Sequence, residues 1–135
     1  MTDCIFCKIA KGEIPCNKVY EDESTLAFLD IEPVAKGHTL VIPKKHFETM
    51  DEMDEETVLA TQKTVQKIAK ALLKFNKGYN VIQNNKPEAG QEIPHIHYHI
   101  IPRNKEDELF FTWPKMETSK EELLELKTKI KNFLK

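Results

Sequence analysis

Three histidines at strict two-residue intervals, His95, His97 and His99, constrain this chain more than any other feature. The residues between them, Ile96 and Tyr98, favour an extended strand. Alternate side chains of a strand share one face, so we expect the three imidazoles to form a row with Cα atoms about 7 Å apart. The opposite face of this strand is apolar. Three titratable rings on one face indicate chemistry rather than packing.

An imidazole row can serve two kinds of chemistry, and the histidines alone do not decide between them. Histidines at alternate strand positions can bind a metal ion. A neutral histidine can also act as a nucleophile when a neighbouring group orients its other nitrogen. The loop before the row, Ala89-Gly90-Gln91, offers small residues and backbone N–H groups that can hold anionic oxygen atoms.

A second signal is the pair of cysteines in Cys4-Ile5-Phe6-Cys7. Such a pair can be redox-active or metal-binding. No strand precedes it, which counts against a thioredoxin-like motif. A tetrahedral zinc site needs two further ligands, and His46 and one member of the histidine row are the candidates. Cys16 stands alone and is expected to be a partly buried small residue.

The size and charge of the chain exclude several classes of function. Its 135 residues are expected to form one domain, residues 1–135. With 20 basic and 22 acidic residues, the net charge of −2 gives no electrostatic basis for nucleic-acid binding. No apolar run is long enough to span a membrane. The start of the chain lacks the features of a signal peptide, and three cysteines fit a disulfide framework badly, so we expect a cytoplasmic protein.

The hydrophobic pattern predicts an α+β fold. Strands are expected over 19–21, 25–30, 39–42 and 79–83, followed by the histidine strand. Asp54 can cap a long helix over about 55–75, and Ser119 opens a capping box before a second helix that ends near 134. The apolar face of that last helix is expected to pack against the sheet; it comprises Leu123, Leu126, Ile130 and Phe133.

Several blocks of the sequence together resemble the histidine-triad superfamily. His95-Ile96-His97-Tyr98-His99-Ile100-Ile101 matches its His-φ-His-φ-His-φ-φ motif, in which φ is apolar. Three further blocks precede this motif in the family's order, namely Leu26-Ala27-Phe28-Leu29-Asp30-Ile31, Gly37-His38-Thr39-Leu40-Val41-Ile42-Pro43-Lys44 and Ala89-Gly90-Gln91. The resemblance covers about residues 4–103, which leaves 104–135 as a C-terminal extension with a helix.

The resemblance implies a fold and an activity. The fold is an antiparallel sheet with one long helix, and the sheet is continuous across a homodimer. The activity is that of a nucleotide hydrolase or nucleotidyl transferase acting at the α-phosphorus of purine nucleotides, such as AMP conjugates. His97 would attack phosphorus to give a covalent nucleotidyl-histidine, which water would release as the nucleoside monophosphate. His99 and His38 would orient and polarise the attacking His97. The implied nucleotide contacts are His97 and His99 together with Phe6, Asp30, Ile31, Asn84, Gly90, Gln91 and Glu92.

The cysteines also acquire a role through this resemblance. Some histidine-triad proteins hold zinc through a Cys-x-x-Cys pair and two histidines. The matching residues are Cys4, Cys7, His46 and His95. Four protein ligands leave zinc no open position for a water molecule, so the implied site is structural. His97 is then free to act as the nucleophile.

One position departs from the family pattern. The adenosine phosphoramidase branch carries a serine after the glutamine of the loop, where this chain has Glu92. A carboxylate at this position opposes a developing negative charge, which leaves the preferred leaving group open. The stretch Pro87-Glu88-Ala89-Gly90-Gln91 also resembles the dinucleoside polyphosphate hydrolase branch, so dinucleoside polyphosphate hydrolysis stays an alternative activity. A nucleotide-sensing regulatory protein with vestigial catalysis is a second alternative, and a zinc-dependent interaction module is a third. The segment Phe110-Phe111-Thr112-Trp113-Pro114 could reach the active site of a partner subunit.

Overall fold

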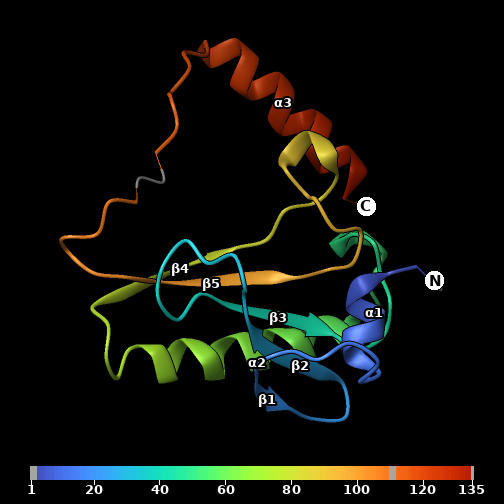
Figure 1. Cartoon of the computed structure of the whole chain (residues 1–135). Coiled ribbons are helices and arrows are strands. Elements are labelled where there is room, and N and C mark those ends of the chain that lie inside the picture. Colours follow the sequence, from blue (N-terminus) through green and yellow to red (C-terminus); the bar gives the residue numbers. More distant parts are fainter. Residues whose placement is uncertain (1–2, 110–111, 135) are drawn as a thin grey trace.

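The computed structural model describes residues 3–109 and 112–134. Its centre is a five-stranded antiparallel sheet with strand order β1-β2-β3-β5-β4 (Figure 1). The strands are β1 (Lys18–Glu21), β2 (Thr25–Leu29), β3 (Thr39–Pro43), β4 (Gly78–Ile82) and β5 (Tyr98–Arg103). The α+β class with an antiparallel sheet is therefore confirmed. The two edges of the sheet are β1 and β4.

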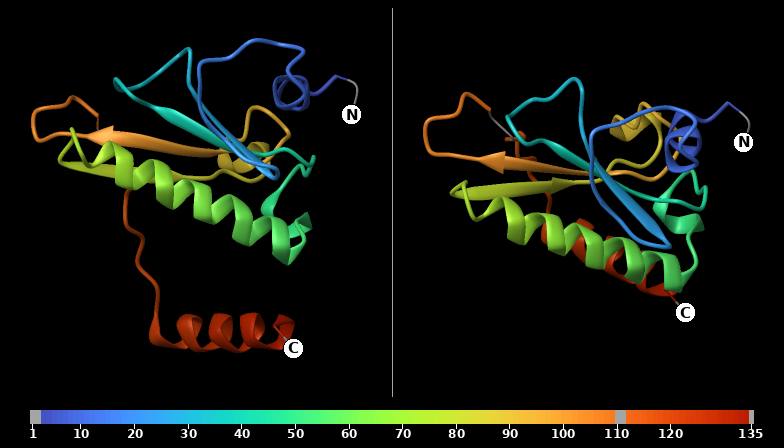
Figure 2. Two further views of the ribbon diagram at one scale, coloured as in Figure 1. Left: turned by 90° about the horizontal axis from the view of Figure 1, so that it is seen from below. Right: turned by 60° about the horizontal axis from the view of Figure 1, so that its bottom comes forward.

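Helices lie on both faces of this sheet (Figure 2). They are α1 (Ile5–Ala10), α2 (Glu55–Leu72) and α3 (Lys120–Phe133), with short 3₁₀ helices η1 (Met50–Glu52) and η2 (Pro87–Ala89). The Asp54 side chain accepts the Thr57 N–H at the start of α2, as the sequence predicts. Helix α1 is an element that the sequence analysis missed.

The core consists of two apolar clusters, one on each face of the sheet. The cluster beneath α2 contains Ala27, Val41, Val65, Ile68, Leu72, Ile96, Tyr98 and Ile100. The cluster beneath α1 contains Phe6, Leu26, Phe28, Leu40 and Ile42. Strands β2 and β3 contribute alternate residues to the two clusters, which is why they are apolar along almost their whole length.

Helix α3 does not pack against the sheet, so that prediction is wrong. None of its residues is buried, and the views agree that it stands away from the sheet (Figures 1 and 2). The capping box at Ser119 and Glu122 is present as predicted. The faces of the sheet are already covered by α1 and α2. Among the described residues, no helix is both long and apolar enough to cross a membrane.

Candidate functional site

The three central histidines do not share one strand. Strand β5 begins at Tyr98, so His95 and His97 lie in the extended segment before it and only His99 belongs to the strand. The backbone explains the late start: the His95 N–H donates to the Ile93 carbonyl at 2.8 Å and the Ile96 N–H donates to the Phe47 carbonyl at 2.8 Å. These amides are therefore used by loops rather than by a neighbouring strand. The predicted apolar opposite face is correct, because Ile96 and Tyr98 are buried beneath α2.

The His97 ring is oriented by the main chain. Its Nδ1 lies 2.7 Å from the carbonyl oxygen of His95. A carbonyl can only accept, so Nδ1 carries the proton and donates it. The neutral ring then has a free lone pair on Nε2, the nitrogen that makes no hydrogen bond with the described residues. This is the tautomer that a histidine nucleophile requires.

A second hydrogen-bonded chain fixes the tautomers of His38 and His99. The Val34 N–H donates to Nδ1 of His38 at 3.2 Å, so the neutral His38 ring carries its proton on Nε2. That nitrogen lies 2.9 Å from Nδ1 of His99 and donates to it. His99 must therefore hold its own proton on Nε2, as a donor available to a ligand. The centroids of the His97 and His99 rings are 5.1 Å apart.

Burial keeps these rings neutral. Desolvation lowers the pKa of His99 to about 4 and also lowers the pKa of His38 and of His97. The carboxylate of Asp30 opposes this shift in all three rings. It lies 3.5 Å from Nε2 of His38. Neutral imidazoles are the form in which one ring can attack while the others donate hydrogen bonds.

Two predicted base contacts lie in different environments. Phe6 is buried, and its ring meets the His97 ring edge-on with centroids 5.1 Å apart. It therefore packs behind the nucleophile candidate. Ile31 follows Asp30 and is 83% exposed, which leaves its side chain free to contact a ligand.

The loop that precedes the histidines is braced by one side chain. The Gln91 Oε1 accepts the Lys86 N–H at 2.8 Å, and its Nε2 donates to the carbonyls of Glu48 and Ile93 at 2.7 and 3.1 Å. The side-chain amide of Gln91 is thus occupied within the protein, and its backbone N–H donates to the Lys86 carbonyl at 3.1 Å. Gly90 adopts φ +90°, a left-handed conformation that favours glycine.

Asn84 and Glu92 flank the same loop. The half-buried side chain of Asn84 faces Gly90. Its Nδ2 lies 3.8 Å from the place that a Cβ atom on Gly90 would occupy. Glu92 is exposed, and its negative charge acts on the His97 ring. Of these loop residues, Glu92 is thus the one whose charge reaches the His97 ring. The sequence did not predict two main-chain groups that orient the rings, the Val34 N–H and the His95 carbonyl. Residue types alone do not show where such groups will lie.

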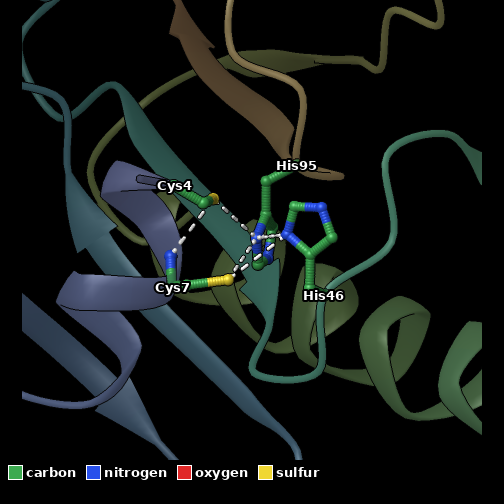
Figure 3. Close-up of side chains that lie close together, drawn as sticks. All are labelled: Cys4, Cys7, His46 and His95. Carbon is green, nitrogen blue, oxygen red and sulfur yellow. Dashed lines mark hydrogen bonds between the residues drawn. The ribbon is translucent and has the colours of Figure 1, made fainter. Parts of the chain in front are cut away.

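A separate cluster joins the N-terminal helix to the histidine segment (Figure 3). Cys4 caps α1 and Cys7 lies in its first turn, while His46 comes from the loop after β3. The ligand atoms of Cys4, Cys7, His46 and His95 all lie within 4.8 Å of one another, so the cluster could bind a metal ion. The sequence-predicted ligand set is thus brought together in space.

The distances within the cluster suit a small tetrahedral ion. Nδ1 of His46 lies 3.2 Å from Nδ1 of His95. Cys7 Sγ lies 3.2 and 3.6 Å from these two nitrogens, and Cys4 Sγ lies 3.4 Å from Nδ1 of His95. Tetrahedral zinc separates its ligands by about 3.3 Å between nitrogens and about 3.6 Å between nitrogen and sulfur. His95 donates Nε2–H to the Pro43 carbonyl at 2.8 Å, which leaves the Nδ1 lone pair facing the cysteines.

Comparisons with known proteins agree with this arrangement. The adenosine 5′-monophosphoramidase of Schizosaccharomyces pombe is 47% identical over 133 residues, 98% of each chain. A crystal structure from Streptococcus mutans has a TM-score of 0.95 at 43% identity and covers 100% of this chain and 87% of that chain. A Zn-bound histidine triad family protein from Mycobacterium smegmatis has a TM-score of 0.78 at 35% identity, over 95% and 98% of the two chains. Residues 11–106 match the HIT domain, and the chain therefore belongs to the histidine-triad (HIT) family.

Proposed function

We propose that this protein is a HIT-type hydrolase that cleaves purine nucleoside phosphoramidates at the α-phosphorus and releases the nucleoside monophosphate. The observation that carries the proposal is the His97 tautomer, which leaves the Nε2 lone pair free while Nδ1–H is held by a carbonyl. The name of the Schizosaccharomyces pombe relative, which is similar along almost its whole length, supports the choice of substrate.

The proposed reaction has two steps. Nε2 of His97 forms a bond to phosphorus as the bond to the leaving nitrogen breaks, and that nitrogen takes a proton from solvent. Water then attacks the nucleotidyl-histidine, which frees the monophosphate and restores the lone pair on Nε2. The Nε2–H of His99, whose tautomer is set through His38, donates to a phosphoryl oxygen in both steps.

The remaining nucleotide contacts follow from the same proposal. Asp30 would accept from the ribose hydroxyls and Ile31 would cover the base. Gly90 and Gln91 would line the phosphate, although their own N–H groups donate to the carbonyls of Pro87 and Lys86. Phe6 would lie near the base, as the family resemblance implies, and would also hold the His97 ring in place by edge-on packing.

The test is turnover of adenosine 5′-phosphoramidate and diadenosine tetraphosphate, side by side, by the wild type and His97→Ala. We expect the variant to lose at least about a thousandfold in kcat while its circular dichroism spectrum and its AMP affinity are retained. Rapid quenching should reveal one adenylyl group on the wild-type chain and none on the variant. Turnover by His97→Ala at the wild-type rate would overturn the proposal.

We also propose that the four-residue cluster holds zinc. Two cysteine sulfurs and two imidazole nitrogens are a common structural zinc set, and a Zn-bound relative is known. Cys4, Cys7, His46 and His95 would bind the ion, which would supply a cross-link between α1 and the histidine segment. All four positions would be taken by protein, so no water is activated there.

The wider assignments rest on family membership. We infer a homodimer whose sheet continues from one copy to the next, a nucleotide rather than a nucleic acid as ligand, no membrane partner and a cytoplasmic location. We treat residues 1–135 as one HIT domain with its core at about 4–103 and an extension at 104–135.

A further inference from the structure

The hydrogen bond between His38 and His99 can be satisfied in two directions. In the structure, Nε2–H of His38 donates to Nδ1 of His99 at 2.9 Å, and His99 keeps its own proton on Nε2. In the reverse arrangement, Nδ1–H of His99 would donate to Nε2 of His38, and each ring would still carry one proton. That arrangement places the proton of His38 on Nδ1 and leaves Nε2 of His99 without a hydrogen. Only the arrangement in the structure gives His99 a donor for a phosphoryl oxygen.

One main-chain group selects this arrangement. The Val34 N–H donates to Nδ1 of His38 at 3.2 Å, the one hydrogen bond that this nitrogen makes within residues 3–109 and 112–134. A proton on Nδ1 of His38 would point at the Val34 N–H, so this bond disfavours the reverse arrangement. The donor form of His99 therefore depends on the place of Val34, which belongs to the loop at residues 31–37.

The 31–37 loop also carries the proposed nucleoside contacts. Asp30 lies at its start and accepts the Glu32 N–H at 2.9 Å, and the Ile31 side chain is 83% exposed. The outer side of the loop is loosely packed, because a hollow behind it is lined by Val34, Ala35, Lys36, Phe75 and Pro102. A segment with few buried contacts opens at a low free-energy cost. A ligand that binds to Asp30 and Ile31 can therefore hold the loop in place.

Gly37 closes the loop onto His38. It adopts φ +98°, a left-handed conformation that favours glycine, and the His38 N–H donates to the Ala35 carbonyl across this turn at 3.1 Å. A Cβ atom on Gly37 would lie 3.2 Å from Cγ of Pro102 in β5, which is closer than an ordinary van der Waals contact. A larger residue at this position would therefore shift the turn, and Val34 with it.

We propose that the 31–37 loop makes the rate of turnover depend on the nucleoside half of the substrate. A ribose held by Asp30 and a base held by Ile31 fix the loop. The Val34 N–H then keeps His38 in its present tautomer, and His99 keeps the proton that it donates to the phosphoryl group. Binding free energy from the nucleoside thus raises kcat rather than affinity alone. Gly37 is the positioning residue of this coupling, and the inference rests on the proposed hydrolase function.

The first test compares adenosine 5′-phosphoramidate with its 2′,3′-dideoxy analogue, which offers no ribose hydroxyl to Asp30. In the wild type we expect kcat for the analogue to be lower by about tenfold or more, whatever the change in KM. In Gly37→Ala the loop no longer responds to the ribose, so kcat for the two substrates should agree within about twofold. An analogue that changes only KM in the wild type would overturn the proposal.

The matched control for this variant is Gly12→Ala. Gly12 also has a left-handed conformation, φ +81°, but a Cβ atom there would meet nothing within 4 Å. It therefore carries the same kind of backbone strain at a distance from the 31–37 loop. Gly12→Ala should keep the wild-type difference in kcat between the two substrates. Loss of that difference in the control as well would refute a specific role for Gly37.

Ring ¹⁵N spectra of the histidine-labelled full-length protein report the tautomers without any turnover. In the AMP complex of the wild type, we expect Nδ1 of His38 and of His99 to be unprotonated. Gly37→Ala should shift His38 toward the form with a proton on Nδ1, and so should Val34→Pro, which lacks the N–H. Unchanged His38 signals in both variants would overturn the proposal. A wild type that hydrolyses neither substrate would refute the proposed function, whereas these spectra would still decide the role of the loop.

Discussion

At the scale of single residues, the main chain sets the chemistry of each histidine. His97 donates to a carbonyl and is left with a lone pair on Nε2, whereas His99 receives a hydrogen bond on Nδ1 and keeps a proton on Nε2. Two neighbouring rings of the same residue type are thereby given opposite roles. The difference originates in the His95 carbonyl and in the Val34 N–H that bonds to His38.

Acid is expected to destabilise the protein partly through His99. Burial lowers the pKa of His99 to about 4, below the value of about 6.5 for an exposed imidazole, so the unfolded chain binds this proton first. The contribution of the neutral, buried His99 ring to the free energy of unfolding is therefore complete above pH of about 6.5. It is lost as the pH falls toward 4. His99→Asn keeps an acceptor for His38 but has no titratable ring.

The measurement is the free energy of unfolding in urea at neutral pH and at pH of about 5. We expect it to fall less between the two conditions in His99→Asn than in the wild type. An equal fall in both proteins would contradict the assigned pKa.

Glu92 is expected to select against leaving groups that carry negative charge. Its carboxylate acts on the His97 ring, so it also opposes a polyphosphate leaving group. Glu92→Ser should raise kcat/KM for diadenosine tetraphosphate about tenfold relative to adenosine 5′-phosphoramidate. The control Glu88→Ser removes the same charge from the exposed η2 turn. A parallel change for both substrates would show that Glu92 has no part in selectivity.

At the scale of elements, zinc in the proposed cluster is expected to stabilise α1. A helix of six residues has little stability of its own, and its N-cap and first turn carry two of the four proposed ligands. Cys4→Ser with Cys7→Ser should abolish stoichiometric zinc and lower the melting temperature by about 10 °C or more, because a closed zinc site contributes folding free energy. Elemental analysis and calorimetry measure the two effects.

The control for this pair is Cys16→Ser. Cys16 is half-buried beside the α1 cluster, as the sequence predicts, and it is not among the proposed ligands. The control should therefore keep its zinc and most of its stability. Stoichiometric zinc in the double variant would refute the assignment.

The sequence predicted elements whose signals are local. The strands at 19–21, 25–30, 39–42 and 79–83 match β1 to β4 within about one residue at each end, and Asp54 and Ser119 cap helices as expected. Helix α1 was missed because its six residues show no clear period. The histidine strand was started too early because alternation cannot reveal that the amides of His95 and Ile96 bond to loops.

The sequence predicted which residue types form the site, but not which ring nitrogens donate and which accept hydrogen bonds. The spacing of His95, His97 and His99 indicated a shared face, and family resemblance separated the metal ligand from the nucleophile. Which nitrogen of each ring carries the proton depends on carbonyls and amides that the fold brings in from elsewhere. The packing of α3 was predicted wrongly because an apolar stripe does not say which molecule it will contact. Of the segment 110–114, Phe110 and Phe111 lie outside the described residues, and Trp113 is exposed.

At the scale of the whole molecule, stability is expected to depend on protein concentration. In the homodimer inferred above, association stabilises the folded state by mass action. Raising the concentration about a hundredfold should therefore raise the melting temperature by several degrees. A constant melting temperature for the wild type would argue for a monomer.

His95 belongs to two sites at once. Its ring faces the cysteines, and its carbonyl oxygen holds Nδ1–H of His97. Under the zinc assignment proposed above, release of the ring from the metal would also loosen the carbonyl that orients the proposed nucleophile. A chelating buffer would therefore mimic a slow, time-dependent inhibitor in kinetic assays, although it never competes with the nucleotide.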